Sequence, residues 1–467
     1  MTVPALPTSA QHVDVVEFEV QVPAGQLIDY DLRRLCSALG VLDPACLAVE
    51  TDGLTRALIT VYKEPPLADL PHARGEDLVM DAQGYINVGR YHDGQIAQRR
   101  LYIPGSGAQR GAMFGTTGAG KSRALQLVLA AEKRSGIVTW LADLKGGQSA
   151  PEAEGQVDWR VTTQEGMILI LRAAVAVIAA RTTRYAAMGR SHFIINRPDP
   201  LLYVHIDEAN RGLEKGAPYR DEAAYLVKEI GRTGRSVGVG IDIEAQAGHV
   251  DELGGSDTLR GMIKEGDTVL LRWSSSMMQS LVADGLLPPG AQLAAIPKLA
   301  GPPQLRSRFA ADQPADELTS TGGMAYLLGG PRPTAVMRFF RVGSAQEVDG
   351  LDPKIVEMYG PGEPARLETT SYEAVGTAYT NREDGIPAQL VEQIQQEAVV
   401  AAPKLTAAAR VLQALEHGPL DKQSLIAAVQ ADGGSTLSAG TISNVLVTLT
   451  KSDQVLSDGP GKYKLPS

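Results

Sequence analysis

The sequence predicts an α/β protein in which a mostly parallel sheet is covered by helices on both faces. Two observations lead to this fold class. Between residues 85 and 343, short apolar runs alternate with longer segments of helical periodicity, which is typical of parallel sheets. At one strand-to-helix junction the chain is rich in glycine, the residue that tight turns favour. We therefore expect an α/β core with smaller units on either side.

The composition is that of an ordinary folded protein. The chain has 467 residues, of which 44% are hydrophobic and 21% are charged, and this length suits about three domains. These proportions exclude a chain that is disordered throughout. Its two cysteines, Cys36 and Cys46, are too few for a disulfide framework or a four-cysteine zinc site and indicate a reducing compartment.

The sequence also predicts a location. The first residues lack the basic run and apolar core of a secretory signal. The most apolar stretch, residues 166–180, contains Arg172 and is shorter than the roughly 20 residues that a bilayer requires. We therefore expect a buried helix there, no transmembrane segment, and a cytoplasmic protein that can lie peripherally at a membrane.

Residues 1–84 are predicted to form a small α+β domain before the α/β core of residues 85–343. Two runs that alternate apolar and polar residues, 13–22 and 54–61, flank a helical stretch at 30–39. Within the core, the helices are predicted at residues 121–134, 165–188 and 219–233.

Residues 344–403 are predicted to be an acidic linker with one helix at 388–401. They hold eleven acidic and three basic residues, and so supply −8 of the net charge of −10. Acidity in a linker usually serves solubility. The remainder of the chain is nearly neutral, so the negative total does not exclude a nucleic-acid partner.

Residues 115–122 match the phosphate-loop pattern G-x-x-x-x-G-K-[ST] between a strand and a helix. The glycines let backbone N–H groups face phosphates, and the helix N-terminus adds a positive field. Lys121 is expected to reach the β and γ phosphates, and the Ser122 hydroxyl to ligate Mg²⁺. The predicted nucleotide-binding residues are Gly115, Thr116, Thr117, Gly118, Ala119, Gly120, Lys121, Ser122 and Arg123.

A second motif completes the predicted site. The apolar run at 201–206 ends in Asp207 and Glu208, and we expect its strand to neighbour the strand of the phosphate loop. Asp207 is then placed to hold Mg²⁺, and Glu208 to orient or deprotonate the attacking water. Paired acids favour an enzyme that hydrolyses ATP over a kinase or a GTPase, so ATP and Mg²⁺ are the predicted cofactors.

Polar residues at the ends of later elements are further candidates. Gln246 follows a strand and is predicted to sense the γ-phosphate. Arg232 and Arg235 end a helix and are candidates for an arginine that completes a neighbouring subunit's site, a contribution worth roughly 10³ to 10⁵ in rate. The helix dipole alone also favours arginine there, so both interpretations stay open. Arg272 is a weaker candidate for the same role.

These motifs resemble the FtsK/SpoIIIE family of RecA-like DNA translocases. The resemblance covers residues 85–342 and rests on segments that occur in the same order: INVGRYHDG, FGTTGAGKS, LADLKGG, HIDEA, GRTGRSVGVGIDIEAQ and GMIKEGDTVLLRWSSSMMQSLVADG. It implies a RecA-like P-loop ATPase core in which Lys121, Ser122, Asp207 and Glu208 carry the nucleotide chemistry. The family's Thr-Gln pair is Ala245-Gln246 here, so the amide is kept and a hydroxyl is lost.

The resemblance also implies an assembly and a substrate. Members of this family form hexameric rings that thread double-stranded DNA through the centre. Because no membrane anchor is predicted, the chain is more similar to the TraB-type conjugative transfer proteins of actinobacterial plasmids and integrative elements than to the cell-division members. A membrane-associated partner protein is therefore also expected. Candidates for DNA contacts in the pore are Ser256, Arg260 and Lys264. Neither Asp143 nor Lys145 of LADLKGG is assigned a catalytic role.

Residues 404–467 are predicted to form a winged helix-turn-helix, with helices at 405–416, 421–430 and 438–451 before a Gly-Pro-Gly turn. In such a unit the last helix reads the major groove and the hairpin contacts the DNA backbone. Because this segment has six basic and five acidic residues, a single unit is expected to bind DNA weakly. Several units in one ring would bind DNA more strongly through multivalency. A unit that contacts only protein is the alternative. The predicted DNA-binding residues are Thr441, Ser443, Asn444, Thr448, Lys451, Lys462 and Lys464.

Two other functions remain open from the sequence. A protein-secretion ATPase of the type VII kind has the same fold, although such proteins usually carry membrane helices and several ATPase units. A DNA-binding regulator with an ATPase switch is the second. Long duplex DNA should strongly stimulate ATP turnover by a translocase and should not do so for a regulator.

Overall fold

The structure is a computed structural model. It describes residues 15–246, 253–254, 259, 261, 265–272, 293–301, 319–401, 407–416, 418–431, 438–458 and 461–466. The chain forms two compact units, Met1–Glu392 and Gln393–Ser467.

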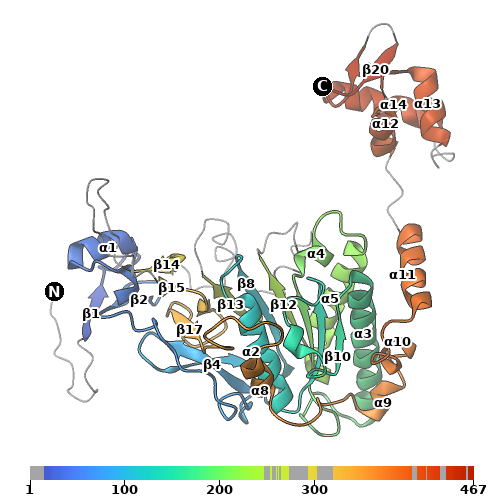
Figure 1. Cartoon of the computed structure of the whole chain (residues 1–467). Helices are drawn as coiled ribbons and strands as arrows, with labels where there is room; N and C mark the ends of the chain where they lie inside the picture. The colour runs from blue at the N-terminus through green and yellow to red at the C-terminus, as the bar shows by residue number, and fades with distance from the viewer. Residues whose placement is uncertain are drawn as a thin grey trace. The chain divides into compact units, whose positions relative to one another are not determined.

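A ten-stranded sheet is the centre of the first unit (Figure 1). Its strand order is β10-β9-β11-β12-β8-β13-β16-β17-β4-β5. The first six strands are parallel and the last four are antiparallel, which confirms the predicted mostly parallel sheet. The parallel strands are β10 (Trp159–Val161), β9 (Val138–Asp143), β11 (Leu202–Asp207), β12 (Val239–Ala245), β8 (Arg110–Gly115) and β13 (Asp267–Leu271). The antiparallel strands are β16 (Met324–Leu327), β17 (Met337–Phe339), β4 (Tyr85–Tyr91) and β5 (Ile96–Arg100).

Helices cover both faces of the parallel strands (Figure 1). Helix α2 (Lys121–Arg134) lies on one face, while α3 (Gln164–Ala187) and α5 (Arg220–Thr233) pack together on the other. Right-handed crossovers require this division, because the chain moves across the sheet in one direction from β8 through β9 to β10 and in the opposite direction from β10 to β13. Among the described helices, α3 is long and apolar enough to cross a membrane, and 61% of its most apolar window is buried. As predicted, it lies against the sheet.

Residues 15–62 form a separate three-stranded sheet, β1-β3-β2, with helix α1. Helix α1 begins after Asp31, whose carboxylate accepts a hydrogen bond from the Arg34 N–H at 2.8 Å, and it ends at Gly40 in the left-handed conformation. The bounds are β1 (Val15–Gln21), α1 (Leu32–Leu39), β2 (Leu47–Thr51) and β3 (Arg56–Tyr62).

Short elements complete the first unit. They are η1 (Pro44–Cys46), β6 (Tyr102–Ile103), β7 (Gly107–Ala108), η2 (Pro151–Ala153), α4 (Asn210–Leu213), η3 (Arg235–Val237), β14 (Leu299–Ala300) and β15 (Thr319–Ser320).

The predicted acidic linker is wrong for residues 352–383, which we call the strap. The strap contains α8 (Pro353–Tyr359), α9 (Thr369–Tyr372) and α10 (Thr377–Thr380), and α11 (Ala388–Ala401) follows it. Its acids and aromatic rings are anchored to the core: Glu368 pairs with buried Arg181 at 2.7 Å, and the Tyr359 hydroxyl donates to Gln126 at 2.5 Å. Ion pairs with arginines and hydrogen bonds to other residues of the core therefore hold this acidic segment in place.

The second unit has its own apolar core. Its elements are α12 (Ala407–Leu415), β18 (Leu420–Asp421), α13 (Lys422–Ala431), α14 (Ala439–Lys451), β19 (Leu456–Ser457) and β20 (Lys462–Lys464). The strands form an antiparallel sheet in the order β18-β20-β19. The buried core residues are Val411, Leu415, Leu425, Val429, Ile442, Leu446, Leu449 and Val455. All three helices lie within two residues of the ranges that the sequence predicts.

Candidate functional site

The phosphate loop joins β8 to α2 at the carboxyl end of the strand. Gly118 (φ +76°) and Gly120 (φ +104°) adopt left-handed backbone conformations that favour glycine. Gly120 has no room for a side chain either, because a Cβ there would lie 2.7 Å from the Gly323 nitrogen. The Gly323 N–H donates to the Ala119 carbonyl at 2.8 Å. A distant glycine turn therefore supports the loop from one side.

Among the other loop residues predicted to bind nucleotide, Gly115 is buried, Thr116 and Ser122 are half-buried, and Thr117 and Arg123 are exposed. The half-buried Ser122 follows Lys121 in the first turn of α2.

Lys121 is buried, with 8% of its surface exposed, yet its Nζ has no hydrogen-bond partner among the described residues. The Glu208 Oε1 atom lies 3.7 Å from that Nζ. An ammonium group has three donors, and buried polar groups are nearly always satisfied. The unmet donors of Lys121 therefore indicate a place for an anionic ligand.

Asp207 and Glu208 end β11 and begin the following turn. The Oδ2 atom of Asp207 is buried without a partner among the described residues. Burial raises the pKa of Asp207, and a hydrogen bond from Ser149 and the charge of Lys121 oppose that rise. Glu208 has φ +52°, a conformation that is uncommon for residues other than glycine and that is found at functional sites.

Gln246 lies beside Glu208, because its Nε2 donates to Glu208 Oε2 at 3.2 Å. The structure differs from the sequence prediction in one respect: β12 separates β11 from β8. Gln246 follows β12, so this inserted strand brings the predicted sensor amide next to the predicted base. The adjacent Ala245 is fully buried.

Asp143 at the end of β9 organises the turn behind Asp207. Its carboxylate accepts hydrogen bonds from the N–H groups of Lys145, Ser149 and Ala150, each at 3.1 Å. The turn places Ser149, the hydrogen-bond donor to Asp207. Asp143 is therefore a positioning residue, while Lys145 is exposed.

The three candidate arginines lie at opposite ends of the parallel strands. Arg272 is at the carboxyl ends, and Arg232 and Arg235 are at the amino ends. Arg272 follows β13, and its guanidinium lies 3.6 Å from where a Cβ of Gly118 would stand. Arg272 is 6% exposed, has φ +46°, and its Nε lacks a partner among the described residues. Burial lowers the pKa of Arg272. By contrast, Arg232 and Arg235 are exposed at the amino end of β12, away from the phosphate loop of their own chain.

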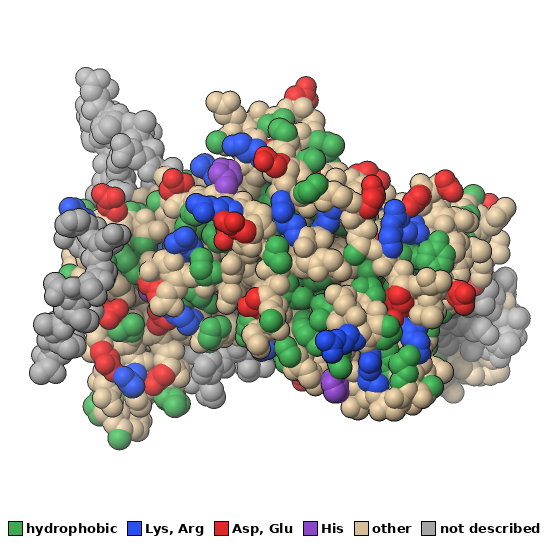
Figure 2. Space-filling view, turned by 90° about the horizontal axis from the view of Figure 1, so that it is seen from below, with side chains coloured by type: hydrophobic (Ala, Val, Ile, Leu, Met, Phe, Trp, Pro, Cys, Tyr) green, Lys and Arg blue, Asp and Glu red, His purple; other side chains and the backbone are tan. Residues whose placement is uncertain are grey.

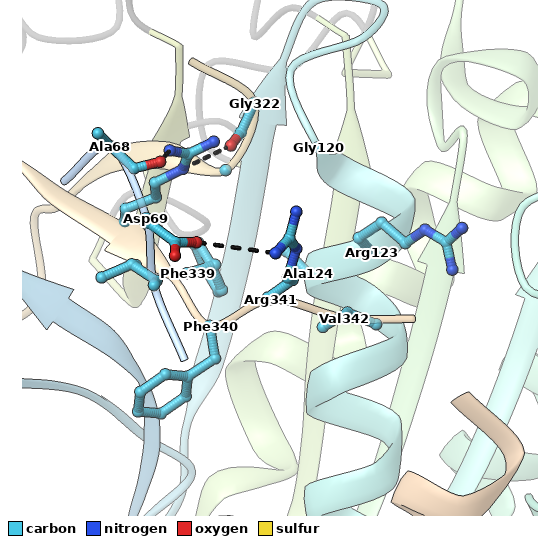
Figure 3. Close-up of a pocket in the computed structure, with 13 residues that line it drawn as sticks. Ala68, Asp69, Gly120, Arg123, Ala124, Gly322, Phe339, Phe340, Arg341 and Val342 are labelled. Carbon is cyan, nitrogen blue, oxygen red and sulfur yellow. Dashed lines mark hydrogen bonds and ion pairs between the residues drawn. The ribbon is translucent and has the colours of Figure 1, made fainter. Parts of the chain in front are cut away.

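A cavity of about 270 Å³ opens beside the first turn of α2 (Figure 3). Residues 68–70, 322–323 and 338–342 line it together with Arg123. Figure 3 shows Arg341 pointing toward Asp69, and the two groups are 3.7 Å apart. Local sequence patterns do not predict these segments, because they lie far from the loop in the chain. The Gly322-Gly323 pair is the local signal of a tight turn.

Arg338 ties these segments together. Its guanidinium donates to the carbonyls of Gly322 at 3.0 Å, Leu67 at 2.7 Å and Ala68 at 2.8 Å. Burial and the nearby charges of Arg341 and Arg272 lower the pKa of Arg338. The cavity wall is therefore positively charged.

The predicted DNA-binding residues lie on α14 and the hairpin of the second unit. Thr441, Asn444, Thr448, Lys451 and Lys462 are exposed.

Four of the predicted DNA contacts are partly occupied within the protein. The hydroxyl oxygen of Thr441 lies 2.9 Å from that of Ser438, in a hydrogen bond. Ser443 is half-buried. The Thr448 hydroxyl donates to the Asn444 carbonyl at 3.0 Å, and Lys464 pairs with Asp458 at 2.7 Å. The exposed Val447, which the sequence analysis omitted, lies on the same face of α14 as Asn444 and Thr448.

The predicted pore residues Ser256, Arg260 and Lys264 lie outside the described residues. On the face of the molecule shown in Figure 2, Lys and Arg side chains are interspersed with Asp and Glu, and no large patch of one sign is visible there.

No protein-family model and no curated protein matches this chain. Solved structures do show similarity. The conjugation coupling protein TcpA of pCW3, in its monomer form with ATPγS, has 15% identity over 71% of this chain and 86% of its own, with a TM-score of 0.45.

The cytoplasmic domain of the type VII secretion ATPase EccC from Thermomonospora curvata has 18% identity over 64% of this chain, with a TM-score of 0.43, and this chain covers 33% of it. ATPases 2 and 3 of EssC from Geobacillus thermodenitrificans have 14% identity over 73% of this chain and 53% of their own, with a TM-score of 0.41. The chain is thus similar, at low identity, to solved structures of a conjugation coupling protein, a type VII secretion ATPase and ATPases 2 and 3 of EssC.

Proposed function

We propose that this chain is an ATP-driven translocase of double-stranded DNA that acts as a hexameric ring. The observation that supports nucleotide binding is that three buried atoms lack hydrogen-bond partners among the described residues: Lys121 Nζ, Asp207 Oδ2 and Arg272 Nε. Lys121 begins α2, Asp207 ends β11 and Arg272 follows β13, so all three lie at the carboxyl ends of the parallel strands. Two cationic groups and one carboxylate suit a triphosphate with Mg²⁺.

The residues present fit ATP and Mg²⁺. Backbone N–H groups of residues 115–120 and Lys121 would hold the phosphates, while Ser122 and Asp207 would hold the ion. Bound Mg²⁺ would neutralise charge on the phosphates. Glu208 accepts the proton of the attacking water, and Gln246 fixes the orientation of that carboxylate through the 3.2 Å hydrogen bond.

Arg272 supplies positive charge to the site of its own chain. Its position beside Gly118 supports a role in contacting the phosphates. Arg232 and Arg235 lie at the amino ends of the parallel strands, away from the phosphate loop of their own chain. A role for either in ATP hydrolysis therefore requires the site of a neighbouring subunit. The cavity of Figure 3 adjoins the first turn of α2, and a base attached to phosphates in the loop would reach it.

The second unit is proposed to be a winged helix-turn-helix that recognises a short DNA sequence. Its element order of helix, strand, helix, helix, strand, strand supports that assignment. Helix α14 would enter the major groove with Thr441, Asn444, Val447 and Thr448, and Lys451 and Lys462 would contact phosphates. Six copies in one ring would strengthen a weak single contact.

A role in conjugative DNA transfer, at the membrane through a partner protein, completes the proposal. It rests on the sequence resemblance.

Stimulated ATP turnover tests the proposal. The full chain is expected to hydrolyse ATP faster with long duplex DNA and to displace a third strand from a DNA triplex. Lys121→Ala should abolish both activities and leave duplex binding intact, whereas Lys354→Ala, which alters an exposed lysine of the strap, should change neither. If the rate of ATP hydrolysis is the same with and without duplex DNA, the result would instead favour a regulator or a protein-secretion ATPase.

A further inference from the structure

A second group of ionisable side chains lies deeper in the sheet, beneath α2. His205 of β11 and Asp242 and Glu244 of β12 are each 1% exposed or less. One nitrogen of the histidine and one oxygen of each carboxylate all lie within 4.8 Å of one another. His205 and Asp242 face each other across paired strands. The nucleotide chemistry proposed above uses none of these three side chains.

Glu132 of α2 fixes the orientation of the histidine ring. His205 Nε2 lies 2.9 and 3.0 Å from the two Glu132 oxygens, and the Thr139 hydroxyl donates to Glu132 Oε2 at 2.8 Å. Metal-binding histidines in proteins commonly donate their other ring nitrogen to a carboxylate in this way. When His205 is neutral and carries its proton on Nε2, toward Glu132, the Nδ1 lone pair faces Glu244.

The spacing at Nδ1 suits an ion better than a hydrogen bond. Nδ1 and Glu244 Oε1 are 3.4 Å apart, beyond the usual range of about 2.7–3.2 Å for N–H···O bonds. Two ligands of a tetrahedral zinc ion, with bonds of about 2.0 Å, are about 3.3 Å apart. The 3.4 Å separation also fits two atoms that share a small cation.

Unmet carboxylate oxygens provide the independent sign of a missing ligand. Asp242 Oδ1 and Glu244 Oε2 are buried and have no hydrogen-bond partner among the described residues. The other Asp242 oxygen accepts from Arg99 at 2.9 Å, and Arg99 also pairs with Asp267 at 3.0 Å.

Four buried carboxylates, those of Glu132, Asp242, Glu244 and Asp267, therefore face one arginine and one histidine. Such an excess of buried negative charge requires a cation or protons.

We propose that His205 Nδ1, Glu244 and Asp242 bind one divalent transition-metal cation of the zinc class, with Glu132 as the outer partner of the histidine. Imidazole with carboxylates suits zinc, whereas Mg²⁺ prefers oxygen ligands and keeps several waters, for which a site this enclosed has little room. Binding releases any proton held on Nδ1 or Glu244.

The cation would join β11 to β12 two residues before Asp207 and two residues before Gln246. It would thereby fix the spacing of the two strand ends that carry the candidate site. Because the cluster is fully buried, the ion has to enter as the chain folds.

The test is metal content, which does not depend on ATP turnover. The full chain is refolded with Zn²⁺ or with a chelator, and bound metal is measured by mass spectrometry after gel filtration. We expect about one equivalent of zinc per chain and a higher melting temperature with zinc. Refolding with Co²⁺ should give the visible absorption bands of a tetrahedral site.

Glu244→Gln should reduce bound zinc to about a tenth of an equivalent or less, while Glu152→Gln, which alters a buried carboxylate outside the cluster, should retain it. Retention of zinc by Glu244→Gln would overturn the assignment. So would an unaltered chain that holds no zinc and melts at the same temperature after either refolding. In that case a proton on Glu244, whose pKa burial raises to about 7, takes the place of the cation.

Discussion

Two buried charged regions of the first unit differ in how completely their groups are satisfied. At the junction of the strap with the core, Asp158 accepts hydrogen bonds from Trp140 Nε1 at 2.9 Å, the Tyr379 hydroxyl at 2.6 Å and Arg382 Nε at 3.1 Å. The Arg382 guanidinium also lies 4.1 Å from the centre of the Tyr379 ring. Both carboxylate oxygens of Asp158 are used.

At the phosphate loop, by contrast, Lys121, Asp207 and Arg272 each keep a buried atom without a hydrogen-bond partner among the described residues. Both regions are equally enclosed, so burial alone does not separate them. A satisfied buried charge holds two parts of the fold together, whereas an unsatisfied one is costly unless a ligand completes it. The difference supports the proposal that a ligand binds at the phosphate loop.

The largest expected effect is on stability at the strap junction. Asp158→Ala should lower the free energy of unfolding by about 3–5 kcal/mol, because it leaves the buried Arg382 charge without its partner. Denaturant unfolding of the full chain measures this. Asp384→Ala, at the exposed acid that directly follows the strap, should change stability by less than about 0.5 kcal/mol. Equal effects would show that the junction does not anchor the strap.

The next effect concerns turnover at the phosphate loop. Glu208→Gln should lower the rate of ATP hydrolysis by about 100-fold or more, because the amide cannot accept the proton of water. Nucleotide affinity should remain, since the side chain keeps its size. Glu214→Gln serves as the exposed control. A variant with full turnover would remove Glu208 from the chemistry.

A pH effect is expected where the N-terminal sheet meets the core. Burial raises the pKa of Glu50, but hydrogen bonds from His92 and Arg332 outweigh it and lower that pKa to about 2, from an ordinary value of 4.5. The pairing therefore stabilises the fold above about pH 4.5, and the contribution is lost as the pH falls toward 2.

Glu50→Gln should weaken this dependence by about 1–2 kcal/mol, as measured by unfolding at pH 7 and pH 3. If the variant and the unaltered chain lose stability in parallel between those two values, Glu50 is not the group that titrates.

The smallest expected effect is on stability at the phosphate loop, and it distinguishes this region most clearly from the strap junction. In the absence of nucleotide, Lys121→Ala should leave the free energy of unfolding unchanged or raise it by up to about 1 kcal/mol, because the ammonium is buried without a hydrogen-bond partner among the described residues. A loss of more than about 2 kcal/mol would place Lys121 with the satisfied charges of the strap junction.

Local patterns predicted much of this fold. The phosphate-loop pattern places Lys121 at the first residue of α2, and helical periodicity locates α3 and α5 to within one residue. The structure also places Gln246 next to Glu208. The helix bounds depend on spacing within one helix, which a sequence shows directly. The contact of Gln246 with Glu208 depends on the order of β11 and β12 in the sheet.

The remaining features depend on contacts between distant residues. The strap looked like a linker because its acids outnumber its bases, yet Glu368 pairs with Arg181, 187 residues away. The strand order that inserts β12 between β8 and β11, and the approach of Arg272 to Gly118, are likewise set by packing. No local pattern in the sequence specifies these contacts.

Calorimetric titration of the full chain with ATP and Mg²⁺ tests most directly whether the unmet charges form a nucleotide site. The unaltered chain should bind one nucleotide per subunit, and binding should be lost in Lys121→Ala. A chain that binds no nucleotide, or a Lys121→Ala variant that binds it with equal affinity, would contradict this account.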